Sequence, residues 1–220
     1  MGIRTVSFKN ENDKSLKQTT EGVFVELSPQ GCLIANLAWN SSNWLRPTLG
    51  DGPSGFKYVE DFRRGIVADP PWESWNFNLE HLVVGGFKYG FFQYTKKPKI
   101  TQPKALFFAS KNPYDRKFYV VGVYGKAEIA DYKLMNVRAP VEYVTGFCRP
   151  DILRLDPVRH LGGKKRIGRV GYNIVSKTEA MNILNDAIKA HQMKGCPKLS
   201  NITRIINVLN NCLNFVRENC

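Results

Sequence analysis

Short apolar runs separated by glycine, proline and polar turns fill most of the chain. Val23–Leu27 and Cys32–Leu37 are two such runs, and Leu106–Ala109 and Phe118–Tyr124 flank a polar segment at residues 111–115. Apolar and β-branched stretches of this length, bounded by turn residues, are typical of β-strands. The last two runs therefore predict a β-hairpin.

Residues 87–94 alternate in a way that favours another strand. With a period of two, Phe87 and Tyr89 share one face, while Lys88, Gly90 and Phe92 share the other. The pattern predicts a short helix over residues 58–64 and a further short strand over 141–144.

Beyond residue 175 the period changes to that of helices. Ser176 followed three residues later by Glu179 predicts a capping box at the start of a helix. Apolar positions then recur at helical spacing over residues 181–191, and again over 202–216 behind Ser200, which can cap a second helix. One apolar stripe on each helix indicates that both pack on a core.

These elements predict an α+β fold with a mostly antiparallel, barrel-like sheet, flanking helices and a helical C-terminal tail. Long alternating β-α units are absent, which excludes doubly wound nucleotide-binding folds. We expect a sheet domain over residues 1–175. The helical segment 176–220 either packs on the barrel or leads to a further domain.

The charge of the chain points to a polyanionic partner. Its 220 residues carry a formal net charge of +13 at pH 7. A folded protein this basic attracts nucleic acid first and an anionic membrane second. No signal peptide or membrane-spanning apolar run is visible, and the five cysteines form no CxxC pair. We expect buried, reduced thiols in a cytoplasmic protein without a membrane partner.

Common catalytic motifs are missing from the sequence. Gly162–Arg166 contains glycines and lysines but lacks the loop length and the Ser/Thr of a phosphate-binding loop. No paired-histidine metal motif or nucleophile elbow occurs, and the acids do not follow a nuclease pattern. We therefore expect a binding protein that has no catalytic residues, no metal ligands and no cofactor; an unrecognised metal-dependent nuclease remains a third hypothesis.

Aromatic residues are interleaved with small polar ones in three places. Residues 39–44 and 72–78 each contain two Trp with Asn and Ser nearby, and residues 87–94 are rich in Phe and Tyr. Such a loop can stack a base between rings and read its edge, or the two Trp can fold back and plug the barrel. The predicted base-pocket residues are Trp39, Asn40, Ser41, Trp44, Trp75, Tyr89 and Phe92.

Basic residues accompany these aromatic clusters. One group surrounds the central strands, and a second lies around Gly162 and Gly163, whose flexibility suits a close approach to a phosphate backbone. The residues predicted to contact nucleic-acid phosphates are Lys88, Lys96, Lys97, Lys111, Arg116, Lys164, Lys165, Arg166 and Arg169.

The central hairpin resembles that of EVE and YTH domains in the PUA-like superfamily. Leu106–Ser110 and Tyr119–Ala127 carry the resemblance, and residues 90–94 are similar to the segment before it. Gln102–Ala105 departs from the Gly-Asp that usually precedes the hairpin's first strand. The resemblance implies a small β-barrel that binds RNA or modified DNA.

A chain of this type with a helical tail also resembles the N-terminal recognition domain of McrB-type restriction subunits. That resemblance implies a reader of a flipped, methylated base in DNA, working with an AAA+ GTPase domain and a nuclease subunit. The motor's phosphate loop is absent here, so the chain would be the reader portion. The alternative is a PUA-like RNA-binding module that acts in RNA modification or translation.

Overall fold

The computed structural model of the chain describes residues 16–18, 24–26, 31–52, 55–132, 135–194 and 199–220. It confirms the α+β class: three sheets are combined with four α-helices and two short 3-10 helices within these residues. The sheets of the described residues are open and do not close into a barrel. None of the described helices is both long and apolar enough to cross a membrane.

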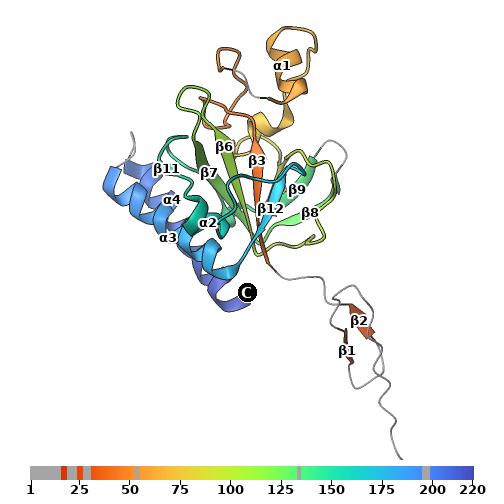
Figure 1. The fold of residues 1–220 in the computed structure, drawn as a ribbon, viewed down its shortest axis with the longest axis vertical. Coiled ribbons are helices and arrows are strands. Elements are labelled where there is room, and N and C mark those ends of the chain that lie inside the picture. The colour runs from red at the N-terminus through yellow and green to blue at the C-terminus, as the bar shows by residue number, and fades with distance from the viewer. Residues whose placement is uncertain (1–15, 19–23, 27–30, 53–54, 133–134, 195–198) are drawn as a thin grey trace, which may run out of the picture.

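A six-stranded mixed sheet forms the centre of the molecule (Figure 1). Its main path runs β10-β7-β6-β3-β12, and β11 also pairs with β7. Only β3 and β6 are parallel, with Leu33 opposite Leu106, and the other pairs are antiparallel. The strands are β3 (Cys32–Leu37), β6 (Ala105–Lys111), β7 (Phe118–Gly125), β10 (Val144–Gly146), β11 (Leu153–Arg154) and β12 (Tyr172–Val175).

The predicted hairpin is confirmed as the antiparallel pair of β6 and β7. Alternate residues of β6 face opposite sides of the sheet, since Ala105 and Phe107 belong to one buried cluster and Leu106 and Phe108 to the other. A register shift after Phe108 interrupts the ladder. The sheet therefore has a core on both faces.

Two long helices cover one face of this sheet (Figure 1). They are α3 (Lys177–Lys194) and α4 (Leu199–Asn219). The capping box of α3 is confirmed, because the Glu179 backbone N donates to Ser176 Oγ (3.3 Å) and the Ser176 backbone N donates to Glu179 Oε2 (2.6 Å). The helices bury apolar stripes in the same cluster as Phe107, so both support the sheet.

The other face is covered by aromatic side chains and by a four-stranded sheet of order β4-β5-β9-β8. Its strands are β4 (Val83–Val84), β5 (Phe87–Gly90), β8 (Glu128–Tyr132) and β9 (Met135–Pro140). The remaining elements are the β1 (Leu16–Gln18) and β2 (Phe24–Glu26) pair, α1 (Lys57–Arg63), α2 (Pro157–Leu161), and the 3-10 helices η1 (Trp72–Trp75) and η2 (Val141–Tyr143).

Four expectations need correction. Ser200 lies inside α4, which begins at Leu199, so it is not the cap of that helix. The expected strand at 141–144 is the 3-10 helix η2 followed by β10, and strand β5 ends at Gly90 rather than continuing to residue 94. Residues beyond Gly90 are held instead by Asn136, whose amide bonds both the N (3.1 Å) and the O (2.7 Å) of Phe92. The cysteines are not all reduced and buried: Cys148 is disulfide-bonded, and Cys220 is free but exposed.

Candidate nucleic-acid interface

The loop after β3 is organised by the side chain of Asn40. Its Oδ1 accepts from the backbone N of Ser42 (2.9 Å) and of Trp44 (3.3 Å), and its Nδ2 donates to Arg46 O (2.9 Å). Asn43 and Trp44 both have positive φ angles, 58° and 56°. Two successive non-glycine residues in this region cost conformational energy, which the Asn40 bonds offset.

Trp39 and Trp44 are buried beneath this loop, 5% and 1% exposed. Their rings meet edge to face, with centroids 6.3 Å apart and planes at 77°. The indole N–H of Trp44 donates to Ala38 O (3.2 Å), and Trp39 packs edge-on to Tyr119. A stacked base needs two roughly parallel open faces, so these rings act as core in this conformation, and their predicted pocket role requires the loop to move.

Trp39, Asn40 and Trp44 do come together around a small void of about 10 Å³. That volume holds about one water molecule. Glu73 of η1 enters the same void; its Oε1 accepts from Ala38 N (3.0 Å), while its Oε2 is buried without a partner among the described residues. Burial raises the pKa of the Glu73 carboxyl to about 7. The position predicted for a base is therefore a void of about one water molecule, whose lining includes the charged residues Glu73 and Arg63.

The other predicted pocket residues are scattered. Ser41 is exposed and Trp75 stacks on His81, with centroids 4.4 Å apart. The Tyr89 hydroxyl accepts a long hydrogen bond from Arg138 (3.4 Å), and Phe92 is buried beside a separate hollow of about 350 Å³. The structure thus brings together three of the seven predicted residues and does not gather the rest.

A larger cavity opens beside the same loop, with a volume of about 360 Å³. The β3 loop forms one wall, the segment after β10 a second and the first turns of α4 a third. Asn43 joins the first two walls, because its Nδ2 donates to Cys148 O (3.3 Å). The cavity is lined by Asn43, Leu45, Phe77, Gly146, Phe147, Cys148, Asn201, Arg204 and Ile205.

This cavity combines apolar rings with polar groups. Phe77 and Phe147 are buried apart from small edges, and Arg204 contributes a guanidinium whose Nη2 donates to Val144 O (3.0 Å). Arg204 is exposed as a whole, while the burial of part of its side chain lowers the pKa of the guanidinium. An apolar cavity of this size with a few fixed polar groups is the usual form of a small-molecule or base site.

No local sequence pattern indicates this cavity directly. Phe77 lies in a noted aromatic cluster, but Phe147 and Arg204 belong to distant segments that only the fold joins. One signal was present: Gly122 lies inside a strand of β-branched and aromatic residues, and a glycine there often marks the close approach of another group.

The predicted phosphate-contacting residues fall into two groups by exposure. Lys88 is 0% exposed and its Nζ donates to His81 O (2.8 Å), so its ammonium lies inside the protein and cannot reach a phosphate in this conformation. Burial lowers the pKa of Lys88 to about 8. The other eight are exposed: Lys96, Lys97, Lys111, Arg116, Lys164, Lys165, Arg166 and Arg169.

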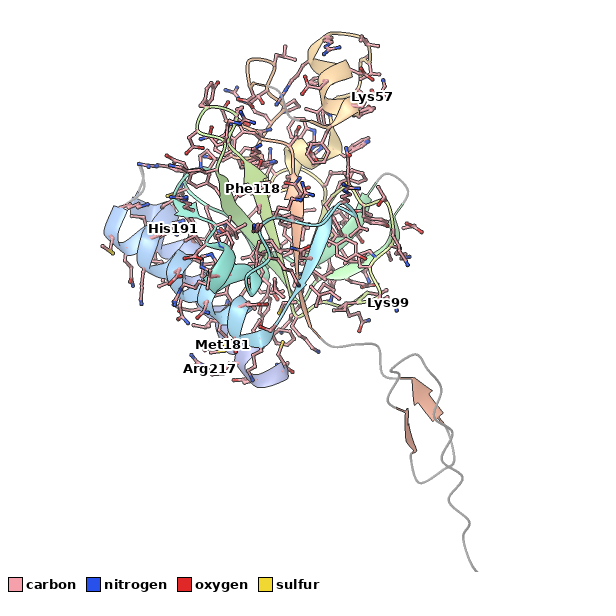
Figure 2. All side chains as sticks on the ribbon, in the orientation of Figure 1. Lys57, Lys99, Phe118, Met181, His191 and Arg217 are labelled. Atoms are coloured by element: carbon pink, nitrogen blue, oxygen red, sulfur yellow. The ribbon has the colours of Figure 1, made fainter. Side chains whose placement is uncertain are left out.

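Basic side chains occur on separate parts of the molecule. Lys57, Lys99 and Arg217 lie at different ends in Figure 2. Near the cavity, Arg46 and Arg149 directly follow the wall residues Leu45 and Cys148, although Arg149 is paired with Asp151 at 3.2 Å. Arg204 is the basic residue among those that line the cavity.

Within the described ranges, no group of three His, Cys, Asp or Glu side chains is arranged to hold a metal ion. Comparison with family models, with curated proteins and with solved structures gives no match. The function must therefore be argued from the site itself.

Proposed function

We propose that this chain is a non-catalytic nucleic-acid-binding module that takes up one base in the cavity between the β3 loop, the end of β10 and α4. The cavity carries the proposal: its volume is about 360 Å³, its walls include Phe77 and Phe147, and Arg204 supplies a cation. A net charge of +13 supplies the attraction to a polyanion.

A base in this cavity must be extruded from its helix. Extrusion costs a few kcal/mol, which the contacts of the base with the polar wall groups and with the exposed edges of Phe77 and Phe147 must offset. A methyl group on the base would bury further apolar area, worth about 0.8 kcal/mol or close to fourfold in affinity. Shape and hydrogen bonds must supply any stronger preference for a modified base.

The residues that resemble EVE and YTH domains lie on the antiparallel strands β6 and β7. We therefore propose a PUA-like reader of a methylated base in DNA, serving as the specificity part of a modification-dependent restriction system. On this proposal, an AAA+ GTPase domain and a nuclease subunit are its partners. A structured RNA is the alternative ligand.

Fluorescence anisotropy with matched oligonucleotides tests the proposal. The probes are a duplex with one methylated cytosine, the same duplex with one methylated adenine, the unmodified duplex and a hairpin RNA. Tighter binding of one methylated duplex supports a DNA reader, whereas tighter binding of the RNA hairpin supports the alternative, an RNA-binding module. Cleavage of any probe with magnesium or manganese would overturn the non-catalytic assignment.

Two tryptophan substitutions on α4 test the cavity itself. Asn201 is exposed and lines the cavity, whereas Asn214 is exposed on the same helix and lies outside it. We expect Asn201→Trp to fill the cavity and weaken binding about tenfold, which corresponds to roughly 1.4 kcal/mol of lost contacts. Asn214→Trp should bind like the wild type. Equal binding by both variants would show that the base does not enter this cavity.

A further inference from the structure

Arg204 lies between two hollows on the surface of α4. It lines the cavity of about 360 Å³, and it also lines a shallower hollow of about 570 Å³ between α4 and η2. The second hollow is formed by Val141, Glu142, Thr203, Arg204, Asn207, Val208 and Asn211. Arg204 is the residue that the two hollows share.

Most N–H donors of the Arg204 guanidinium are available to a ligand. The guanidinium makes one hydrogen bond, to Val144 O (3.0 Å), and no carboxylate of the described residues lies within ion-pair distance of it. A guanidinium has five N–H donors in a planar fork that matches two oxygens of a phosphate. Arg204 is exposed, so its free donors are open to an incoming phosphate.

We propose that Arg204 binds the phosphodiester that joins two nucleotides of an unpaired strand, one with its base in the cavity and the next in the shallow hollow. This inference rests on the proposed function and names its substrate class. Neighbouring bases of a duplex are stacked and face inward, so they cannot enter hollows on the two sides of one cation. Splayed nucleotides of an unpaired or extruded segment can.

The walls of the shallow hollow suit a nucleotide without selecting one base. Thr203, Asn207 and Asn211 offer hydroxyl and amide groups that can donate and accept. Asn211 also reaches across the hollow, with its Nδ2 3.5 Å from Glu142 O. Glu142 is the acidic residue of this wall, and it makes no ion pair with Arg204, so the anion site is not already filled by the protein.

The test compares Arg204→Gln with Arg217→Gln in the full chain. Both changes remove one arginine from α4, but Arg217 is exposed near the opposite end of the helix (Figure 2). The probe is a short single-stranded DNA, titrated at several salt concentrations. We expect Arg204→Gln to reduce the log–log salt slope by about 0.7, the value for one phosphate contact on a single strand. Arg217→Gln should leave the slope unchanged.

A second arm uses the wild-type protein, so it does not depend on the folding of a variant. Each phosphodiester of the probe is replaced in turn by a neutral methylphosphonate. We expect one linkage whose neutralisation weakens binding to the wild-type protein.

The outcomes separate the two proposals. Binding of the single strand with equal slopes for both variants, or with no sensitive linkage, overturns the Arg204 site and leaves the proposed function standing. Absence of binding to every nucleic-acid probe overturns both.

Discussion

Gly122 and Gly146 lie directly opposite each other on the paired strands β7 and β10, and the ring of Phe77 fills the space that their missing side chains leave. A Cβ on Gly122 would come 2.2 Å from Phe77 Cζ, and one on Gly146 would come 2.7 Å from Phe77 Cγ. The ring is also packed edge-on to Trp44 and Phe108. This contact fixes Phe77 as a wall of the cavity.

The first prediction follows from that contact. Gly146→Ala should push Phe77 from its place, lower the free energy of unfolding by about 1–3 kcal/mol, and weaken binding of the preferred oligonucleotide. Gly50→Ala is the control, since a Cβ there meets nothing within 4 Å. Urea unfolding and anisotropy measure the two effects. A Gly146→Ala protein with wild-type stability and affinity would contradict the packing argument.

Local sequence patterns predict most of the secondary-structure elements of this chain. The β6–β7 hairpin, the short helix α1 and the capping box at Ser176 were all predictable, because each depends on neighbouring residues. The end of β5 was not, because it depends on Asn136, a residue 44 positions away from Phe92. The parallel pairing of β3 with β6 likewise depends on a long connection that no local pattern reports.

The candidate site was less predictable for a physical reason. An aromatic residue in a polar loop has the same sequence pattern whether it is open to a ligand or folded into the core, and Trp39 and Trp44 are folded into the core. Lys88 shows the same ambiguity, because strand alternation places it on the buried face with Gly90 and Phe92. Exposure is a property of the tertiary fold, and composition alone does not report it.

The second prediction tests whether the buried tryptophans act as core. Trp44→Ala should lower the free energy of unfolding by about 3–5 kcal/mol, because it removes a buried indole and its bond to Ala38 O. Trp75→Ala should lower the free energy of unfolding by less, since Trp75 is only half-buried. Equilibrium urea unfolding compares them. If Trp44→Ala proves no more costly than Trp75→Ala, Trp44 is not held in the core.

The third prediction concerns the exposed basic segment between α2 and β12. Changing Lys164, Lys165, Arg166 and Arg169 to Ala should weaken binding of all nucleic-acid probes and flatten the salt dependence, by roughly one unit of log–log slope for each lost contact. Lys88→Met is the matched control, because its ammonium is enclosed. Affinity is measured from low to high salt. An unchanged slope in the four-residue variant would show that this segment does not contact phosphates.

The last prediction concerns Glu73, whose carboxyl is 2% exposed beside Trp39 and Trp44. Desolvation raises its pKa to about 7, although the Ala38 backbone N–H and the charge of Arg63 act in the opposite direction. An unfolded glutamate ionises near pH 4.3, so between roughly pH 4.3 and 7 the folded state holds a proton that the unfolded state has lost. The contribution of Glu73 is therefore fully present at low pH and is lost as the pH rises to about 7.

Glu73→Gln removes this titration and keeps an oxygen for the Ala38 N–H. Relative to the wild type, the variant should gain stability as the pH rises from 5 to 7, by at most roughly 1.4 kcal/mol per pH unit, with no further gain above that range. Urea unfolding at a series of pH values measures the difference, and Glu80→Gln, an exposed position, is the control. Parallel pH profiles for wild type and Glu73→Gln would show that the carboxyl titrates as it does in water, and that the void beside Trp39 and Trp44 admits solvent.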